Sequence, residues 1–183
     1  MTQQDPTLSR NVLEMVTIAG EYCSFIENAH VHSSDDLFRS MRSLVPLLYL
    51  RGSLITDIEP QHPETYERYV TQEEWDGIFT SLRDVVGSAD EFSYAAEDDY
   101  GEQTLLKGSI SEHFADVYQD MKDFVLLFKK PSLAARENAI HECKMLFDEH
   151  WGQRLANLLP VIHALSLRSR PDSTEDDDYP GIF

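Results

Sequence analysis

A histidine and two aspartates recur along one strongly patterned stretch of the chain, residues 109–129. His113, Asp116 and Asp120 are spaced i, i+3 and i+7, which places them above one another on one side of a helix. Imidazole and carboxylate groups act in proteins as general acids and bases and as metal ligands. Two carboxylates four residues apart repel each other unless a positive group meets them. The sequence therefore predicts that a basic group from another helix faces this pair.

Candidate partners for the aspartates lie in other helical segments. His150 and Arg154 are four residues apart on the shoulder of an apolar stripe, and Arg51 lies at the edge of another. A basic residue at such an edge is partly buried and needs a partner. Tyr118 and Trp151 are expected to be core residues with satisfied polar tips. The predicted polar cluster consists of Arg51, His113, Asp116, Tyr118, Asp120, His150, Trp151 and Arg154.

The same residue types are compatible with a metal site. Di-metal sites in ferritin-like bundles combine Glu-x-x-His pairs with carboxylates from neighbouring helices. Glu27 and His30 supply one such pair at a helix end, and His113 with Asp116 is a loose equivalent. Because no second Glu-x-x-His lies in a predicted helix, we assign no metal ligand and no cofactor on this basis.

A hydrolytic site is a further alternative, with His113 or His150 as a base that Asp116 or Asp120 orients. Its nucleophile is missing. The sequence contains no Gly-x-Ser-x-Gly elbow, no phosphate-binding glycine-rich loop and no cysteine with an activating neighbour. We therefore assign no catalytic residue and favour a hydrogen-bonded ion cluster that fixes the register of the helices. A metal-dependent enzyme, hydrolase-like or di-metal, is the alternative.

Apolar residues with a period of 3.6 predict the helices that position these side chains. The stripes cover about residues 7–29, 33–56, 71–86, 109–129 and 132–167. Gly20 weakens the first helix and is a candidate for a close helix crossing. Pro46, Gly152 and Pro160 are expected to kink or divide the helices that contain them. The predicted fold class is all-α, a single-domain bundle of about five to six helices over residues 1–167.

Two connections and the C-terminal region lack this period. Residues 57–70 contain two prolines and are expected to be a loop, and residues 88–108 a long loop whose aromatic residues pack over the core or cover a site. Residues 168–183 carry an acidic run and are expected to be a flexible tail. Tyr179, Ile182 and Phe183 follow that run and form a candidate docking segment, with folding back onto the body as the alternative.

The formal net charge of −18 and the pI near 4.6 are unusual for a chain of 183 residues. Such a charge opposes nonspecific binding to nucleic acid or to anionic membranes, and leaves basic proteins and cations as favoured partners. Solubility alone is the simpler explanation, and acidic mimicry of nucleic acid would rest on net charge only. No secretory signal and no apolar run of roughly 20 residues occurs, and Cys23 and Cys143 stand far apart. These features predict a cytoplasmic protein with reduced thiols.

Two motifs carry a resemblance to a known family. The A-D-V-Y-Q-D-M-K stretch at 115–122 and H-W-G at 150–152 resemble a bacterial family of small helical domains of unknown function. L-V-P-L-L-Y-L at 44–50 and the helix with Trp75 also look like that family, so the resemblance covers roughly residues 8–167. It implies an all-α fold and no particular reaction. The positions that match the family pattern are Asp116, Tyr118, Asp120, His150 and Trp151.

Taken together, these features favour a non-enzymatic interaction or accessory protein. Its acidic surface and its tail would bind a protein partner that is basic or carries a groove. The sequence does not identify that partner, and it does not specify an oligomeric state.

Overall fold

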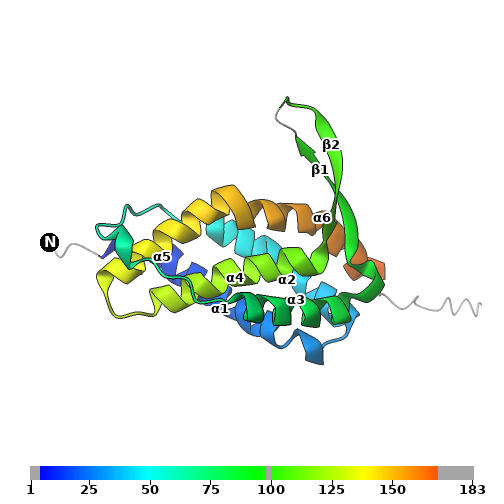
Figure 1. Ribbon diagram of the computed structural model, residues 1–183, viewed down its shortest axis with the longest axis horizontal. Coiled ribbons are helices and arrows are strands. Elements are labelled where there is room, and N and C mark those ends of the chain that lie inside the picture. Colours follow the sequence, from blue (N-terminus) through cyan, green and yellow to red (C-terminus); the bar gives the residue numbers. More distant parts are fainter. Residues whose placement is uncertain (1–4, 98–99, 169–183) are drawn as a thin grey trace, which may run out of the picture.

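The protein is a bundle of α-helices from which a two-stranded β-hairpin projects (Figure 1). The computed structural model describes residues 5–97 and 100–168. The long helices of this part of the chain are α1 (Arg10–Glu27), α2 (Ser34–Ser53), α3 (Gln72–Val86), α4 (Ile110–Phe128), α5 (Leu133–Leu146) and α6 (Gly152–Arg168). The strands β1 (Glu91–Glu97) and β2 (Gln103–Ser109) pair in antiparallel orientation. The predicted all-α fold class is confirmed, with one two-stranded sheet added to the helices.

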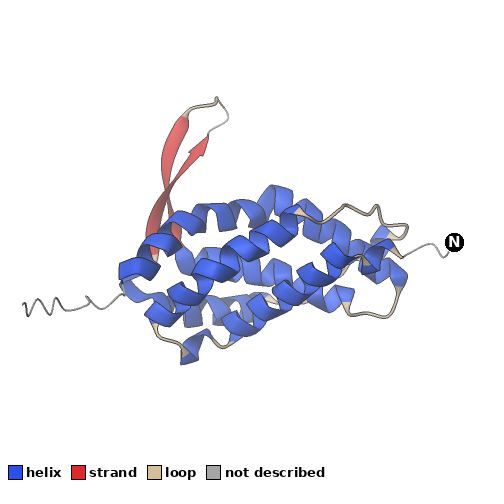
Figure 2. Cartoon of the chain, turned by 180° about the vertical axis from the view of Figure 1, so that it is seen from behind, coloured by secondary structure: helices blue, strands red, loops and turns tan. Residues whose placement is uncertain are grey.

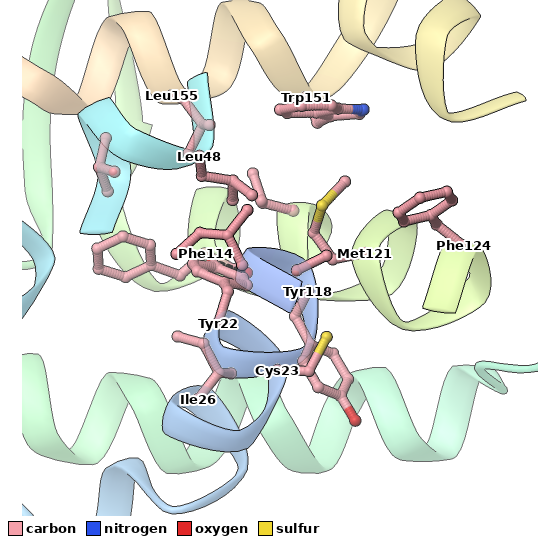
Figure 3. Packing of buried hydrophobic residues seen from close by; sticks show 14 of the residues in the cluster. Tyr22, Cys23, Ile26, Leu48, Phe114, Tyr118, Met121, Phe124, Trp151 and Leu155 are labelled. Atoms are coloured by element: carbon pink, nitrogen blue, oxygen red, sulfur yellow. Dashed lines mark hydrogen bonds between the residues drawn. The ribbon is translucent and has the colours of Figure 1, made fainter. Parts of the chain in front are cut away.

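Helix α4 is the centre of the bundle. It is in contact with α1, α3, α5 and α6, and 14 of its 19 residues are buried. Figure 3 shows its Phe114 and Met121 between Tyr22 of α1 and Trp151, which precedes α6. The Tyr22 hydroxyl donates to the carbonyl oxygen of Phe114 over 2.9 Å, so the buried phenol is satisfied within the core. A helix enclosed in this way can carry polar side chains only where neighbouring elements supply partners for them.

Polar side chains fix where the helices begin. The side chains of Ser33, Ser109 and Ser132 each accept the backbone N–H three residues later. Thr71 and Glu74 form a reciprocal capping box, with backbone to side-chain distances of 3.2 and 3.0 Å. These caps lie where the sequence places the starts of the helices.

Of the expected helix divisions, one is present. Helix α2 runs through Pro46 and α6 through Pro160 without a division, because packing of their buried faces outweighs one lost backbone hydrogen bond. The break lies between α5 and α6, where Phe147–Trp151 form a π-helical turn. A Cβ on Gly152 would stand 2.3 Å from the carbonyl oxygen of Phe147, so this turn requires glycine at its end.

The prediction of a long loop over residues 88–108 is wrong, because most of this stretch is the hairpin. Strand β1 sets Phe92 and Tyr94 on one face, and their rings cover Gly108 of β2 at 3.0–3.1 Å from where a Cβ would stand. Gly101 takes a φ of 82° in the connection between the strands. Figure 2 shows the hairpin rising away from the bundle.

The described residues end with α6 at Arg168. The predicted acidic tail and its docking residues Tyr179, Ile182 and Phe183 lie outside the described residues. None of the helices in the described part of the chain combines the length and the apolar character of a membrane span.

Two helical glycines make a matched pair for a stability test. A Cβ on Gly52 would stand 2.2 Å from the Trp151 ring and 2.7 Å from the Phe147 ring, so the close helix crossing is here. Nothing lies within 4 Å of the corresponding position on Gly20, which corrects the expectation of a crossing there. We expect Gly52→Ala to lower the free energy of unfolding by about 1–3 kcal/mol through overpacking. Gly20→Ala should raise it by about 1 kcal/mol through helix propensity.

Urea unfolding of both variants, followed by circular dichroism, measures the two changes. Equal effects of the two substitutions would show that the contact between α2 and the π-helical turn is looser than the distances indicate.

Candidate functional site

Asp120 of α4 lies at the centre of a network of charged side chains that come from several elements. Its side chain is 2% exposed. One carboxylate oxygen accepts from Nδ1 of His150 over 2.6 Å, and the other accepts from Nη2 of Arg68 over 3.3 Å. His150 comes from the π-helical turn and Arg68 from the loop before α3. Two segments far apart in sequence are therefore held to α4 by one carboxylate.

Arg154 connects Asp116 to His150. Its Nε donates to Nε2 of His150 over 3.0 Å, and its Nη2 lies 2.7 Å from the Asp116 carboxylate. Because a guanidinium has only donors, Nε2 of His150 must be the acceptor, which leaves Nδ1–H to donate to Asp120. This set of hydrogen bonds therefore requires a neutral imidazole in one tautomer.

Asp116 also accepts from the indole N–H of Trp75 over 2.9 Å, which ties α3 to the network. Burial raises the pKa of the Asp116 carboxyl above its ordinary value, although Arg154 and the Trp75 indole act in the opposite direction. Trp75 stacks on Phe79 with 5.2 Å between ring centroids, so the indole is held in place on α3 as well. The contact is a second reason why α3 takes a fixed position on α4.

A third carboxylate, Asp123, holds the loop that precedes α3. It accepts from the backbone N–H groups of Tyr69 and Val70 over 2.7 and 2.9 Å, and from Nε of Arg68 over 3.1 Å. Three donors on one carboxylate order the backbone of this loop. We call the connected set the polar network; its members are Arg68, Trp75, Asp116, Asp120, Asp123, His150 and Arg154.

The structure brings together four residues of the predicted cluster and places the other four elsewhere. Arg51 pairs with Glu14 at 2.5 Å, in a surface hollow of about 570 Å³ between α1 and α2. The Tyr118 hydroxyl donates to Glu27 over 2.9 Å, and Trp151 is a core residue whose indole N–H donates to the carbonyl oxygen of Cys143 over 3.1 Å. Burial, followed by the contact with Glu27, raises the pKa of Tyr118.

His113 lies at the base of the hairpin instead of joining the aspartates. Its ring is in edge contact with Phe92 and Tyr94, with centroids 5.2 and 5.9 Å apart, and only 4% of the residue is exposed. Nδ1 of His113 has no hydrogen-bond partner among the described residues. Burial, and then the nearby Arg154 charge, lowers the pKa of His113 to about 4.

Sequence reasoning missed Arg68, Trp75 and Asp123. Asp123 follows Asp116 and Asp120 at i+7 and i+3, so helical spacing alone could have found it. The apolar stripe of its helix predicts that Trp75 is buried, but no pattern indicates that its N–H reaches Asp116. Arg68 lies in an irregular loop, where no periodicity predicts the direction of a side chain.

The pairing of His150 with Asp120 resembles the His–carboxylate pair of a general base. It differs at the second ring nitrogen of the histidine, which in a general base would be free to take a proton. Nε2 of His150, the nitrogen that would take a proton, already accepts from Arg154. Glu27, from the Glu-x-x-His pair considered as a metal motif, accepts instead from Tyr118 and Lys122. Within residues 5–97 and 100–168, no three His, Cys, Asp or Glu side chains are grouped so that they could hold a metal ion.

The buried and exposed sides of the network differ in charge. The side chains of Asp116, Asp120 and Asp123 are 15%, 2% and 6% exposed, whereas those of Arg68 and His150 are 49% and 35% exposed. The carboxylates thus form the floor, and the basic groups lie over them toward solvent. In this arrangement the basic side chains pair with the carboxylates beneath them. The negative charges are therefore covered and are not presented to a ligand.

Comparison with known proteins gives a family and a fold. A family model described as a domain of unknown function, DUF5063, matches residues 6–168. The crystal structure of protein BF1032 from Bacteroides fragilis, a structural genomics target, is similar, with a TM-score of 0.77 and 28% sequence identity. The similarity covers 92% of this chain and 98% of that one. Among curated proteins, none matches the chain.

Removal of the central carboxylate tests how much the network stabilises the bundle. We expect Asp120→Ala to lower the free energy of unfolding by about 3 kcal/mol, because His150 and Arg68 lose a buried partner. Asp148→Ala, which breaks an exposed pair with Lys144, should cost less than about 1 kcal/mol. Urea unfolding measures both. A loss no greater for Asp120→Ala than for Asp148→Ala would contradict a structural role for the network.

His113 should make stability depend on pH. With a folded pKa of about 4 against 6.5 in the unfolded chain, acid protonates this histidine in the unfolded chain first. Stability is therefore lost as the pH falls from about 6.5 to about 4, by at most about 3 kcal/mol. His113→Phe keeps an aromatic ring against Phe92 and removes the titration. Unfolding free energies measured across this pH range should show a shallower slope for the variant, and an unchanged slope would rule out His113 as the source.

Proposed function

Since the chain belongs to the family of the domain of unknown function DUF5063, we propose its function from its own geometry: it is a non-enzymatic protein that binds a basic or groove-bearing protein partner. The observation that supports this proposal is that the polar groups of the network bind one another. Both ring nitrogens of His150 and the carboxylates of Asp116, Asp120 and Asp123 all have partners inside the chain. These groups stabilise a scaffold.

The alternative, a metal-dependent enzyme, requires groups that the network already uses. A base at His150 would need Nε2 free, and ligation by Asp120 would need its contacts with Arg68 and His150 broken. Breaking a buried pair of this kind costs about 3 kcal/mol or more, which catalysis would have to offset. This cost supports the scaffold over the enzyme.

The scaffold presents an acidic stripe on the outer side of α3. Glu73, Asp76 and Asp84 are spaced i, i+3 and i+11, which places them on one side of the helix, and all three are exposed. No ion pair within the described residues neutralises them. The Trp75 contact with Asp116 holds α3 in place, so the network positions this stripe.

The acidic run at 175–178 adds negative charge beyond α6. Charged groups on both elements favour a partner with clustered Lys and Arg, and such attraction weakens with ionic strength. The aromatic and apolar residues that follow the run, Tyr179, Ile182 and Phe183, would supply apolar contacts to the same partner. We assign the tail and the stripe to one binding function on this basis.

Affinity capture with charge-neutralised variants tests this function. The stripe variant combines Glu73→Gln, Asp76→Asn and Asp84→Asn, and the tail variant lacks residues 169–183. We expect both to lose partners that the full chain retains, and we expect added salt to release those partners. Mass spectrometry quantifies the captured proteins.

The matched control removes the same three charges from other exposed positions, Glu21→Gln, Glu59→Gln and Glu149→Gln. It should retain the partners, because the net charge change is equal and only its location differs. If the control loses the partners as the stripe variant does, overall charge is responsible, and the proposed surface is wrong.

A further inference from the structure

The β-hairpin, described over residues 91–97 and 100–109, is an arm that packs on the bundle at its base. Figures 1 and 2 show it projecting from the helices in two opposite views. At the base, Phe92 is 7% exposed and lies against His113 of α4. Further out, Leu105 is 75% exposed and Leu106 is 43% exposed. The distal half of the arm therefore presents apolar side chains to solvent.

An arm of two strands is an unusual element to leave uncovered. A two-stranded hairpin is marginally stable by itself in water, and both of its outer edges carry unpaired backbone groups. In the register of this hairpin, Leu106 opposes Tyr94 and Leu105 opposes Ala95, so apolar residues lie on both faces. Addition of further strands would satisfy the edge and cover the two leucines.

We propose that the arm pairs with the arm of a second copy of this chain, β2 against β2 in antiparallel orientation about Leu105. A two-fold axis at Leu105 makes each arm present the same strand to the other, as an isologous interface requires. The four strands then form one antiparallel sheet. The acidic stripe on α3 lies outside this contact, so the dimer is independent of partner binding there.

The distribution of charged residues favours β2, and not β1, as the strand that pairs with the second copy. Strand β1 begins and ends with glutamate, Glu91 and Glu97, so pairing β1 with itself in full register sets like residues opposite each other. Strand β2 has one charged residue, Lys107, which is paired with Glu91 of the same arm. Pairing about Leu105 sets Lys107 opposite the neutral Gln103 of the second copy. The acidic β1 edges remain outside and oppose addition of further strands.

The geometry also lets two strongly acidic bodies approach. From residue 105 to the base at 109 is four residues, so the bases of the two arms stand about 27 Å apart along the paired strands. The Debye length in physiological salt is about 8 Å, so repulsion between the bodies is largely screened. A contact between two seven-residue strands is small beside the roughly 1,200 Å² of a standard interface, so we expect a weak dimer that forms only at high protein concentration.

Single cysteines on β2 test the register. Residues directly opposite in antiparallel strands have Cα atoms about 4.5–5.5 Å apart, which suits a disulfide. Leu105→Cys should therefore cross-link to itself under mild oxidation at concentrations where the protein sediments as a dimer. Lys107→Cys, equally exposed, lies about 14 Å from its copy in this register and should not. The native Cys23 and Cys143 are buried and leave the reaction to the new thiol.

Opposite charges at the same position give a second test. Leu105→Asp and Leu105→Lys should each sediment as a monomer at every concentration, because like charges meet at the two-fold axis. An equimolar mixture of the two should restore the dimer. At concentrations where the wild-type chain is a monomer, both variants should unfold at the wild-type urea midpoint, since this side chain is largely exposed.

The proposal is overturned if the wild-type chain remains a monomer at all concentrations, or if the Lys107→Cys variant cross-links as readily as the Leu105→Cys variant. It is also overturned if the wild-type dimer persists in Leu105→Asp, which would place the contact elsewhere on the molecule.

Discussion

Two buried carboxylates and a third that is partly buried, all on one helix, are the constraint on which the rest of this structure depends. Asp116, Asp120 and Asp123 lie along α4, and an unpaired charge in such a position is strongly disfavoured. Donors from three other segments meet these carboxylates: Trp75 of α3, Arg68 and its neighbouring backbone in the loop, and His150 and Arg154 of the C-terminal segment. These segments donate hydrogen bonds to all three carboxylates only when each has its observed position along α4. The carboxylates therefore fix the register of these segments against α4.

The π-helical turn is the distortion through which the C-terminal segment reaches this register. A π-helical turn is wider than an α-helical one, and it places His150 toward α4 while Arg154 follows one turn later. Two glycines make room for it. Gly152 admits the carbonyl group of Phe147, and Gly52 of α2 admits the Trp151 ring. The room left by these two glycines, in addition to the charges, therefore determines where the network can form.

The part of the polar network that lies on helices could be predicted from the sequence, because its residues recur at helical spacing. The i, i+4 spacing of Asp116 and Asp120 and of His150 and Arg154 carries the pairing that the structure shows. Arg68 could not be predicted, because its direction is set by Asp123 and not by any local period. The hairpin was missed because each strand spans only 7 residues, and most of β2 is exposed on both faces and so lacks an apolar–polar alternation.

His113 lies at the base of the arm, and the charge of Arg154 in the polar network contributes to its lowered pKa. Its ring lies beneath Phe92 and Tyr94 at the base of the arm, and both this burial and the Arg154 charge lower its pKa to about 4. A protonated His113 would place a second positive charge near Arg154, which binds Asp116 and His150. Exposure of His113 by movement of the arm would therefore raise its pKa, and its charge would act on the network. The pKa of His113 thus depends both on its burial beneath the arm and on the charge of Arg154 in the network.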